Sequence, residues 1–261
     1  IRTIVRTFED DLSAALNAAY PPDRAAELSR RYSGAFGSDY RAAFSAADAL
    51  ADIDLAETLG PDAIEARFFW RPGMPESEVA LRLHHLGEPI MLSRRVPLLE
   101  NLGFSVIDER TYCIARAEGH PLFVHDMILS LRAGLAFDQQ AAKRLRQAVL
   151  AVWRDRAESD GFNALVLSAG LDWRKAALLR TIARYLRQTD IPYSIDYLWG
   201  ALQRNPTVAA LLTARFAARF APDVRQRDRA EHKADREIAA ALEKVQSLDD
   251  DTILRAFRQV I

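Results

Sequence analysis

The sequence predicts an α+β fold in which helices flank a four-stranded antiparallel sheet, and three observations support this prediction. Apolar residues recur at helical spacing over residues 1–62 and again over 137–261. Between these regions, residues 63–131 contain short segments in which apolar and polar residues alternate. The elements follow the order helix, strand, strand, helix, strand, strand, which favours one antiparallel sheet covered by helices.

The composition excludes several classes of protein. The chain has 261 residues, with 35 Lys plus Arg and 36 Asp plus Glu, so its formal net charge is −1. This balance gives no overall attraction to nucleic acid or to anionic lipid. No apolar run reaches the roughly 18 residues that span a bilayer. The chain begins at Ile1 without an initiator Met, which is compatible with a piece of a longer protein.

Residues 1–45 are predicted to form N-terminal helices. Apolar residues recur at the spacing of one helix face over 8–19, and Pro21 stops that run. A second helix is expected over 23–32.

Residues 46–132 are predicted to form the α+β domain. Ser93 is suited to cap its second helix, and Gly103 is suited to the position after that helix ends. The expected elements are a helix over 46–59, strands over 63–71 and 78–85, a helix over 94–102, and strands over 104–115 and 122–131.

Residues 133–261 are predicted to form a helical domain. Asp172 and Ser194 are suited to N-cap positions, and Asn205-Pro206 reads as an N-cap followed by Pro in the first turn. A last helix is expected to begin near Asp250. Charges of both signs at helical spacing predict a solvated helix over 225–244, and a solvated face is also expected for Arg215, Arg219, Arg225, Arg227 and Arg229.

Motifs for nucleotide and hydrolytic chemistry are missing from the sequence. It contains no G-x-G-x-x-G turn, no G-x-x-x-x-G-K-[ST] loop, no G-x-S-x-G and no H-E-x-x-H. The lone cysteine, Cys113, excludes an internal disulfide and fits a reducing compartment. We expect it to be a small core residue rather than a nucleophile, because no base is identifiable. We therefore predict no catalytic, cofactor-binding or metal-ligating residue in this chain.

Other polar and aromatic residues are expected to serve structure. His84 and His125 could join a carboxylate at a metal, but surface or hydrogen-bonded histidines are the preferred interpretation. Asp108, Glu109 and Arg110 are expected to form ion pairs on the exposed sheet face. The aromatic run 68–70 is expected to pack in the core rather than stack on nucleic-acid bases.

The segment from Glu78 to Leu131 resembles most of an ACT domain. It contains a strand, a helix, the sequence LLENLGFSVIDERTY (98–112), and a hairpin to LFVHDMILSL (122–131). The remaining helix and strand of that family's βαββαβ pattern precede this segment, at 46–59 and 63–71, rather than follow it. The resemblance implies a circularly permuted, ferredoxin-like ACT domain with the sheet order first, second, fourth, third.

A second resemblance covers nearly the whole chain and is to the large bacterial NAD-specific glutamate dehydrogenases. The matching phrases are FEDDL (8–12), RYSGAF (31–36), ADI (51–53), PLLENLGFSVIDER (97–110), VWRDRAESDGFNALVLSAGLDWRKAALLRTIARYLRQT (152–189) and LDDDTILRAF (248–257). The resemblance implies a segment that precedes the catalytic domain. The family's catalytic lysines and nucleotide-binding glycines have no counterpart here.

This resemblance implies what the chain does. The parent enzyme would oxidise glutamate to 2-oxoglutarate and ammonium, with NAD bound outside this segment. The segment would be a regulatory or assembly part without a catalytic site, in a cytoplasmic homo-oligomer that involves neither nucleic acid nor membrane. Its partner would be the remainder of the same polypeptide.

Two alternatives remain open at this stage. In the first, the chain is an amino-acid-sensing module in which the loop 87–95 binds an effector through Ser93, Arg94 and Arg95, since an arginine can pair with a ligand carboxylate. The loop reads GEPIMLSRR and lacks the usual ACT turn of an acidic residue, Arg, Pro and Gly. In the second, it is a free-standing scaffold or RNA-binding protein.

Overall fold

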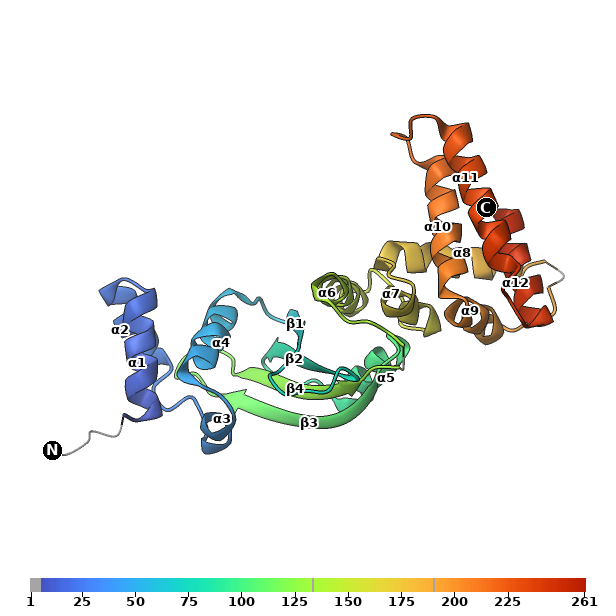
Figure 1. Ribbon diagram of the computed structural model, residues 1–261. Coiled ribbons are helices and arrows are strands. Elements are labelled where there is room, and N and C mark those ends of the chain that lie inside the picture. Colours follow the sequence, from blue (N-terminus) through green and yellow to red (C-terminus); the bar gives the residue numbers. More distant parts are fainter. Residues whose placement is uncertain (1–5, 133, 190) are drawn as a thin grey trace. The chain divides into compact units, whose positions relative to one another are not determined.

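The α+β prediction is confirmed by the computed structural model, which describes residues 6–132, 134–189 and 191–261 (Figure 1). The sheet contains β1 (Ile64–Phe69), β2 (Glu78–Leu86), β3 (Ser105–Ile114) and β4 (Leu122–Ser130). The helices up to β3 are α1 (Phe8–Ala19), α2 (Pro22–Arg31), α3 (Ser38–Ala43), α4 (Ala46–Thr58) and α5 (Leu92–Asn101). The later ones are α6 (Gln139–Trp153), the 3₁₀ turn η1 (Gly161–Ala164), α7 (Leu165–Ser168), α8 (Trp173–Leu186), α9 (Ile195–Arg204), α10 (Pro206–Phe220), α11 (Arg227–Leu242) and α12 (Leu248–Val260).

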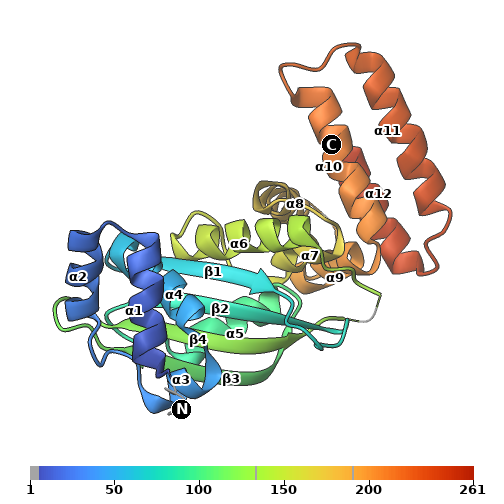
Figure 2. The same cartoon turned by 60° about the vertical axis from the view of Figure 1, so that its left-hand side comes forward.

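The sheet has the predicted strand order. Its strands lie in the order β1-β2-β4-β3 (Figure 2). The first two strands are antiparallel, with Ala66 opposite Leu83 and Arg67 opposite Arg82. Because a strand presents alternate side chains to opposite faces, this register puts Arg82 and His84 on one face and Leu81 and Leu83 on the other.

The described residues form two compact units. The first contains the described parts of 1–74, 80–92 and 107–129, and the second contains the described parts of 75–79, 93–106 and 130–261. The predicted division into 1–45, 46–132 and 133–261 stays a prediction. Its second boundary falls at residue 133, which lies outside the described residues.

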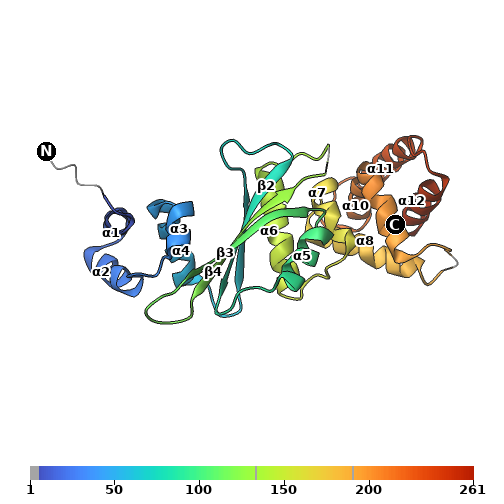
Figure 3. The ribbon, with the colours of Figure 1, turned by 90° about the horizontal axis from the view of Figure 1, so that it is seen from below.

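The first unit is built around one apolar core. Helices α1, α2 and α4 contribute Leu16, Leu28 and Ile53, and the sheet contributes Ile114 and Val124. These helices lie together in Figure 3. Helix α1 begins with a capping box in which Thr7 and Asp10 each satisfy the other's backbone N–H. Ser45 and Asp48 do the same for α4. Helix α3 was not predicted; it has six residues and begins after Gly37 without a side-chain cap.

The second unit has a core of its own, made by η1 and the helices from α8 to α12. Leu179, Leu198, Leu212, Ile238 and Phe257 are all fully buried in it. Helices α10 and α11 lie side by side in Figures 1 and 2. The cap predictions hold for α8 and α9, where the side chains of Asp172 and Ser194 accept from Lys175 and Tyr197 N–H.

The predicted N-cap of α10 and the predicted start of α12 need correction. Helix α10 begins at Pro206 as expected, but Asn205 makes no capping hydrogen bond. Its side-chain amide instead donates to the Ala201 carbonyl at 2.9 Å and to Asp250 Oδ2 at 3.0 Å. Helix α12 begins at Leu248 rather than near Asp250, because Ser247 is its N-cap.

The basic residues near α10 and α11 are not a uniformly solvated face. The Arg215 side chain is only 12% exposed and lies 3.0 Å from Asp235. Arg219 donates to the Ile261 carbonyl at 2.8 Å, and Arg227 donates to the Ala221 carbonyl at 2.8 Å. The arginines therefore join α10 to α11, to α12 and to the turn after α10, which their spacing along the sequence could not show.

Asp250 is a buried carboxylate at the start of α12. Its side chain is 5% exposed and accepts from Arg204 Nη2 at 2.6 Å and Nε at 3.0 Å. The hydrogen bonds from Arg204 lower the pKa of Asp250; burial opposes this shift, and Asn205 adds to it.

We expect Asp250→Asn to lower the free energy of unfolding at neutral pH by about 1–2 kcal/mol, because it removes the carboxylate that accepts from Arg204. The loss stays small because the Arg204 side chain keeps much of its hydration. A carboxyl with a lowered folded-state pKa stabilises the fold above its unfolded-state pKa, and this contribution is lost as the pH falls through the folded-state value. Urea denaturation at several pH values should show the two proteins converging in strong acid. An unchanged difference at low pH would contradict this assignment.

Gly161 opens η1 where the Trp199 ring leaves no room for a side chain. A Cβ at residue 161 would lie 2.4–2.8 Å from three atoms of the Trp199 ring. That contact is shorter than a van der Waals contact, so the ring would have to move out of a close-packed site.

Gly161→Ala is therefore expected to destabilise the chain by about 1–3 kcal/mol in urea denaturation, as overpacking does. Gly60→Ala is the matched control, since no atom lies within 4 Å of a Cβ placed there. Equal stability of the two variants would show that the indole does not hold this position.

Candidate functional site

The three predicted effector residues have three different environments. Helix α5 begins at Leu92, so Ser93 lies inside its first turn rather than at the cap that the sequence suggested. Ser93 is exposed, whereas Arg95 is only 5% exposed. The Arg94 guanidinium lies 3.6 Å from the centroid of the Trp153 ring, a cation–π contact that occupies its planar face. A shared carboxylate-binding role for these residues is not visible in this geometry.

The loop before α5 is fixed by a chain of hydrogen bonds. Ile90 N–H donates to Nε2 of His125, which is fully buried, at 3.0 Å. Since Nε2 accepts, the neutral ring carries its proton on Nδ1, which lies 2.8 Å from Thr111 Oγ1. Thr111 then donates to Glu109 Oε1 at 2.7 Å. His125 is thus a structural side chain that positions backbone.

His84 is also buried, in a polar group between α4 and β2. Its Nε2 lies 2.8 Å from Asp52 Oδ1, and the Tyr40 hydroxyl donates to Asp52 Oδ2 at 2.6 Å. Burial is the main cause that raises the pKa of Tyr40, and the Asp52 charge adds to it. Asp52 and His84 are 3% and 2% exposed. The expectation of surface histidines is therefore wrong for His84 and His125, while hydrogen bonding is confirmed.

Charged residues continue this group along the same sheet face. Arg82 Nη1 donates to Asp48 Oδ1 at 3.1 Å, and its guanidinium lies 4.3 Å from the centroid of the Phe44 ring. Asp126 accepts from Arg71 and lies 3.5 Å from Arg82 Nε. Burial acts to raise the pKa of Asp48, but the hydrogen bonds from Ser45, together with the one from Arg82, outweigh it and lower that pKa. Such a paired network holds α4 on the sheet.

The surroundings of His84 and His125 bear on the alternative of a shared metal. Across the described parts of the chain, no three His, Cys, Asp or Glu side chains are grouped so that they could hold a metal ion. His84 and His125 each make their own hydrogen bonds instead, so the alternative of a shared metal is not supported.

Several smaller expectations can be compared with the structure. Cys113 is exposed, so the expectation of a core residue is wrong, and loss of hydration raises the pKa of its thiol. Of the aromatic run 68–70, Phe68 is buried but Trp70 is 48% exposed. Asp108 and Arg110 lie 3.8 Å apart with side chains more than half exposed, as expected for an ion pair on the sheet surface.

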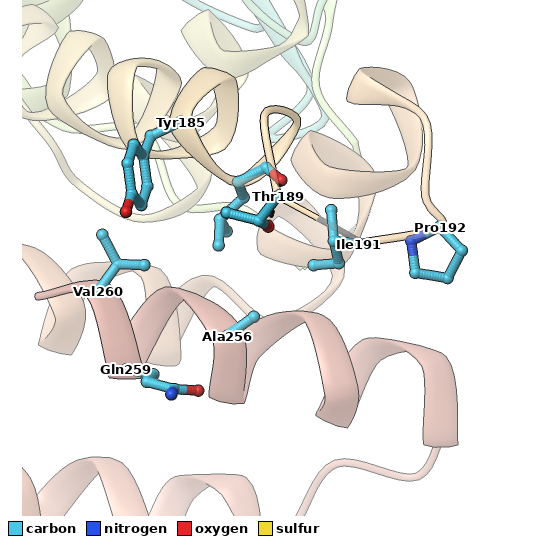
Figure 4. A pocket seen from close by; sticks show the side chains of 8 residues that line it. Tyr185, Thr189, Ile191, Pro192, Ala256, Gln259 and Val260 are labelled. Atoms are coloured by element: carbon cyan, nitrogen blue, oxygen red, sulfur yellow. Dashed lines mark hydrogen bonds between the residues drawn. The ribbon is translucent and has the colours of Figure 1, made fainter.

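A hollow of about 770 Å³ lies between the end of α8 and α12 (Figure 4). Figure 4 shows Tyr185 of α8 facing Val260 of α12. The residues that line it are Tyr185, Leu186, Thr189, Ile191, Pro192, Ala256, Gln259 and Val260. None of these residues is Asp, Glu, His, Lys or Arg, so the lining offers no ion-pairing group, and the Tyr185 phenol is its one side chain of a type that transfers protons.

We expect Asp52→Ala to lower the free energy of unfolding by about 2–5 kcal/mol, because it leaves buried His84 and Tyr40 groups without their shared acceptor. Asp54→Ala on the exposed side of the same helix should cost less than about 1 kcal/mol. Chemical denaturation of both variants measures the difference. Similar losses would mean that the buried carboxylate has no special role.

Comparison with known proteins identifies three matching family models. The model for glutamate dehydrogenase helical motif 2 matches residues 15–59, the model for the ACT3 domain matches 63–142, and the model for helical motif 3 matches 157–222.

Relatives match almost the whole chain. The NAD-specific glutamate dehydrogenase of Mycobacterium tuberculosis is 33% identical over 98% of this chain, and that of Halomonas elongata is 34% identical over 99%. The enzyme of the same name from Pseudomonas aeruginosa is 31% identical over 98%. In each case the chain spans only 16% of the relative's length. The chain therefore belongs to the large NAD-specific glutamate dehydrogenases, as one segment of such a protein.

Proposed function

We propose that this chain is a non-catalytic regulatory and assembly segment of an NAD-dependent glutamate dehydrogenase. The whole enzyme would convert L-glutamate, NAD⁺ and water into 2-oxoglutarate, ammonium, NADH and a proton. The observation that carries the proposal is the match over 98–99% of this chain to proteins of that name, together with its 16% share of their length.

The location proposed for NAD is outside this segment. Nucleotide sites of dehydrogenases use a glycine-rich turn between a parallel strand and a helix N-terminus. This sequence has no G-x-G-x-x-G, and its first two strands form an antiparallel hairpin. Asp52 is hydrogen-bonded to His84, and His125 accepts from the backbone N–H of Ile90. These contacts support a structural role for the buried polar side chains rather than a reactive one.

The partners proposed for this segment are the rest of the same polypeptide and further copies of it in a homo-oligomer. Its formal net charge of −1 supports neither nucleic acid nor anionic membrane as a partner. Within the described residues, no helix is both long and apolar enough to cross a bilayer. A cytoplasmic location fits a glutamate-oxidising enzyme and is part of the proposal, as is the division into domains at 45/46 and 132/133.

We expect the 261-residue chain to produce no NADH from glutamate and NAD, whereas the full-length protein does so. The absorbance of NADH, followed directly without coupling enzymes, measures the activity of both proteins. A sensitive control adds 2-oxoglutarate, ammonium and NADH and follows the reverse reaction. Turnover by the chain alone in either direction would contradict the absence of a reactive centre.

A further inference from the structure

The hollow between the end of α8 and α12 leaves apolar side chains in water (Figure 4). Tyr185 and Val260 both line it, and they are 53% and 39% exposed. Figure 4 shows the two side chains facing each other from the two helices. Covering apolar surface of this kind with another apolar surface is favourable, because it removes that surface from water.

The described lining of the hollow suits an apolar polypeptide better than a charged small molecule. It contains no Asp, Glu, His, Lys or Arg, so an ionic ligand would find no partner of opposite charge there. The Thr189 hydroxyl already donates to the Leu186 carbonyl at 2.7 Å. Apolar grooves with few polar groups are typical sites for the apolar face of a helix.

The walls of the hollow are fixed by the core beneath them. Leu186 of α8 and Phe257 of α12 are buried in the same core of the helical unit. Ala256, which lines the hollow, packs against that core. A segment that binds between the two helices therefore meets a preformed surface, and this lowers the cost of ordering on binding.

The last turn of α12 forms one wall of the hollow. Ala256, Gln259 and Val260 all line it. The next residue, Ile261, is buried, and its carbonyl accepts from Arg219 Nη1 at 2.8 Å. That contact fixes the backbone at residue 261 beside the hollow, so a polypeptide that continues from this residue starts at its edge.

The length of the relatives is the reason to consider such a continuation. This chain spans only 16% of their length, and the proposed function makes it one segment of a longer polypeptide. A segment tethered at residue 261 by a short flexible linker meets the hollow at an effective concentration in the millimolar range. A second copy or a separate protein would instead lose its own translational and rotational freedom. The tether therefore favours the same polypeptide as the occupant.

We propose that the polypeptide following residue 261 in the whole enzyme folds back over the hollow and packs apolar side chains on Tyr185 and Val260. The hollow is then the contact through which the helical unit holds the next part of the enzyme. This inference rests on the proposed function, because it needs the chain to continue. It assigns the assembly role of the segment to one surface, between α8 and α12.

Photo-crosslinking of the full-length protein tests the proposal. The photoreactive residue p-benzoylphenylalanine takes the place of Tyr185, since it keeps an aromatic ring there, and mass spectrometry identifies the peptides that it joins. They should include a peptide that follows residue 261 in the same chain. Crosslinks confined to residues 1–261, a crosslink that doubles the mass of the chain on a denaturing gel, or no crosslink would overturn the proposal.

Two substitutions in the crosslinking protein separate docking from mere proximity. Val260→Asp puts a carboxylate into the apolar contact and should lower the yield of this crosslink at least tenfold, because a charge is costly to cover. Leu248→Asp is the matched control on the same helix, since Leu248 is 80% exposed and does not line the hollow. Both positions are exposed, so neither substitution should unfold the protein. Equal yields in the two variants would overturn the assignment of the contact.

The crosslinking experiment needs neither NAD nor turnover, so its result is separate from that of the activity assay. A full-length protein that oxidises glutamate but gives no such crosslink would remove this inference and leave the proposed function intact. A full-length protein that gives the crosslink but does not oxidise glutamate would contradict the proposed function and leave the docking surface in place.

Discussion

The helical unit depends on how it accommodates one buried positive charge. Arg180 comes from the middle of α8, where a charged side chain is costly unless acceptors surround it. Asp160, Asn163 and the Glu158 carbonyl supply those acceptors, the last at 3.2 Å. All three lie on the irregular stretch between α6 and α7. The hydrogen bonds to the Arg180 guanidinium therefore fix the course of that stretch.

The first unit solves the same problem with a different set of groups. There the burial of charge is shared between a helix and a strand: Asp48 and Asp52 of α4 face Arg82 and His84 of β2. Asp48 and Asp52 are four residues apart, about one turn of a helix, so they lie on one face of α4. Arg82 and His84 are two residues apart, so they lie on one face of β2. The network therefore specifies the register of α4 on the sheet as well as holding it there. A purely apolar face would leave that register less determined.

Much of the fold could be predicted from the sequence, because strands and helix caps depend on residues that are close together along the chain. The strands were found because their apolar residues alternate, and the caps at Asp172 and Ser194 were found because such residues bond nearby N–H groups. Helix α3 was missed because six residues show too little periodicity. The partners of Asn205 and Arg215 lie 45 and 20 residues away, and nothing in a short window reports them.

The surroundings of the predicted effector residues could not be inferred from the sequence. Position in an ACT-like loop suggested Ser93, Arg94 and Arg95, but the side chains of Arg94 and Arg95 are occupied by an aromatic ring and by the interior. Whether a guanidinium can receive a ligand depends on what else it touches, and that information is three-dimensional.

The close packing of the Trp199 ring on Gly161 constrains how the sequence of this region can change during evolution. No residue with a side chain fits at 161 while the indole stays where it is. A lineage that exchanged Gly161 first would pass through a strained intermediate, whereas one that first replaced Trp199 with a smaller side chain would open a void that a later change could fill. The order of substitutions is therefore constrained, and the two positions are expected to drift as a pair.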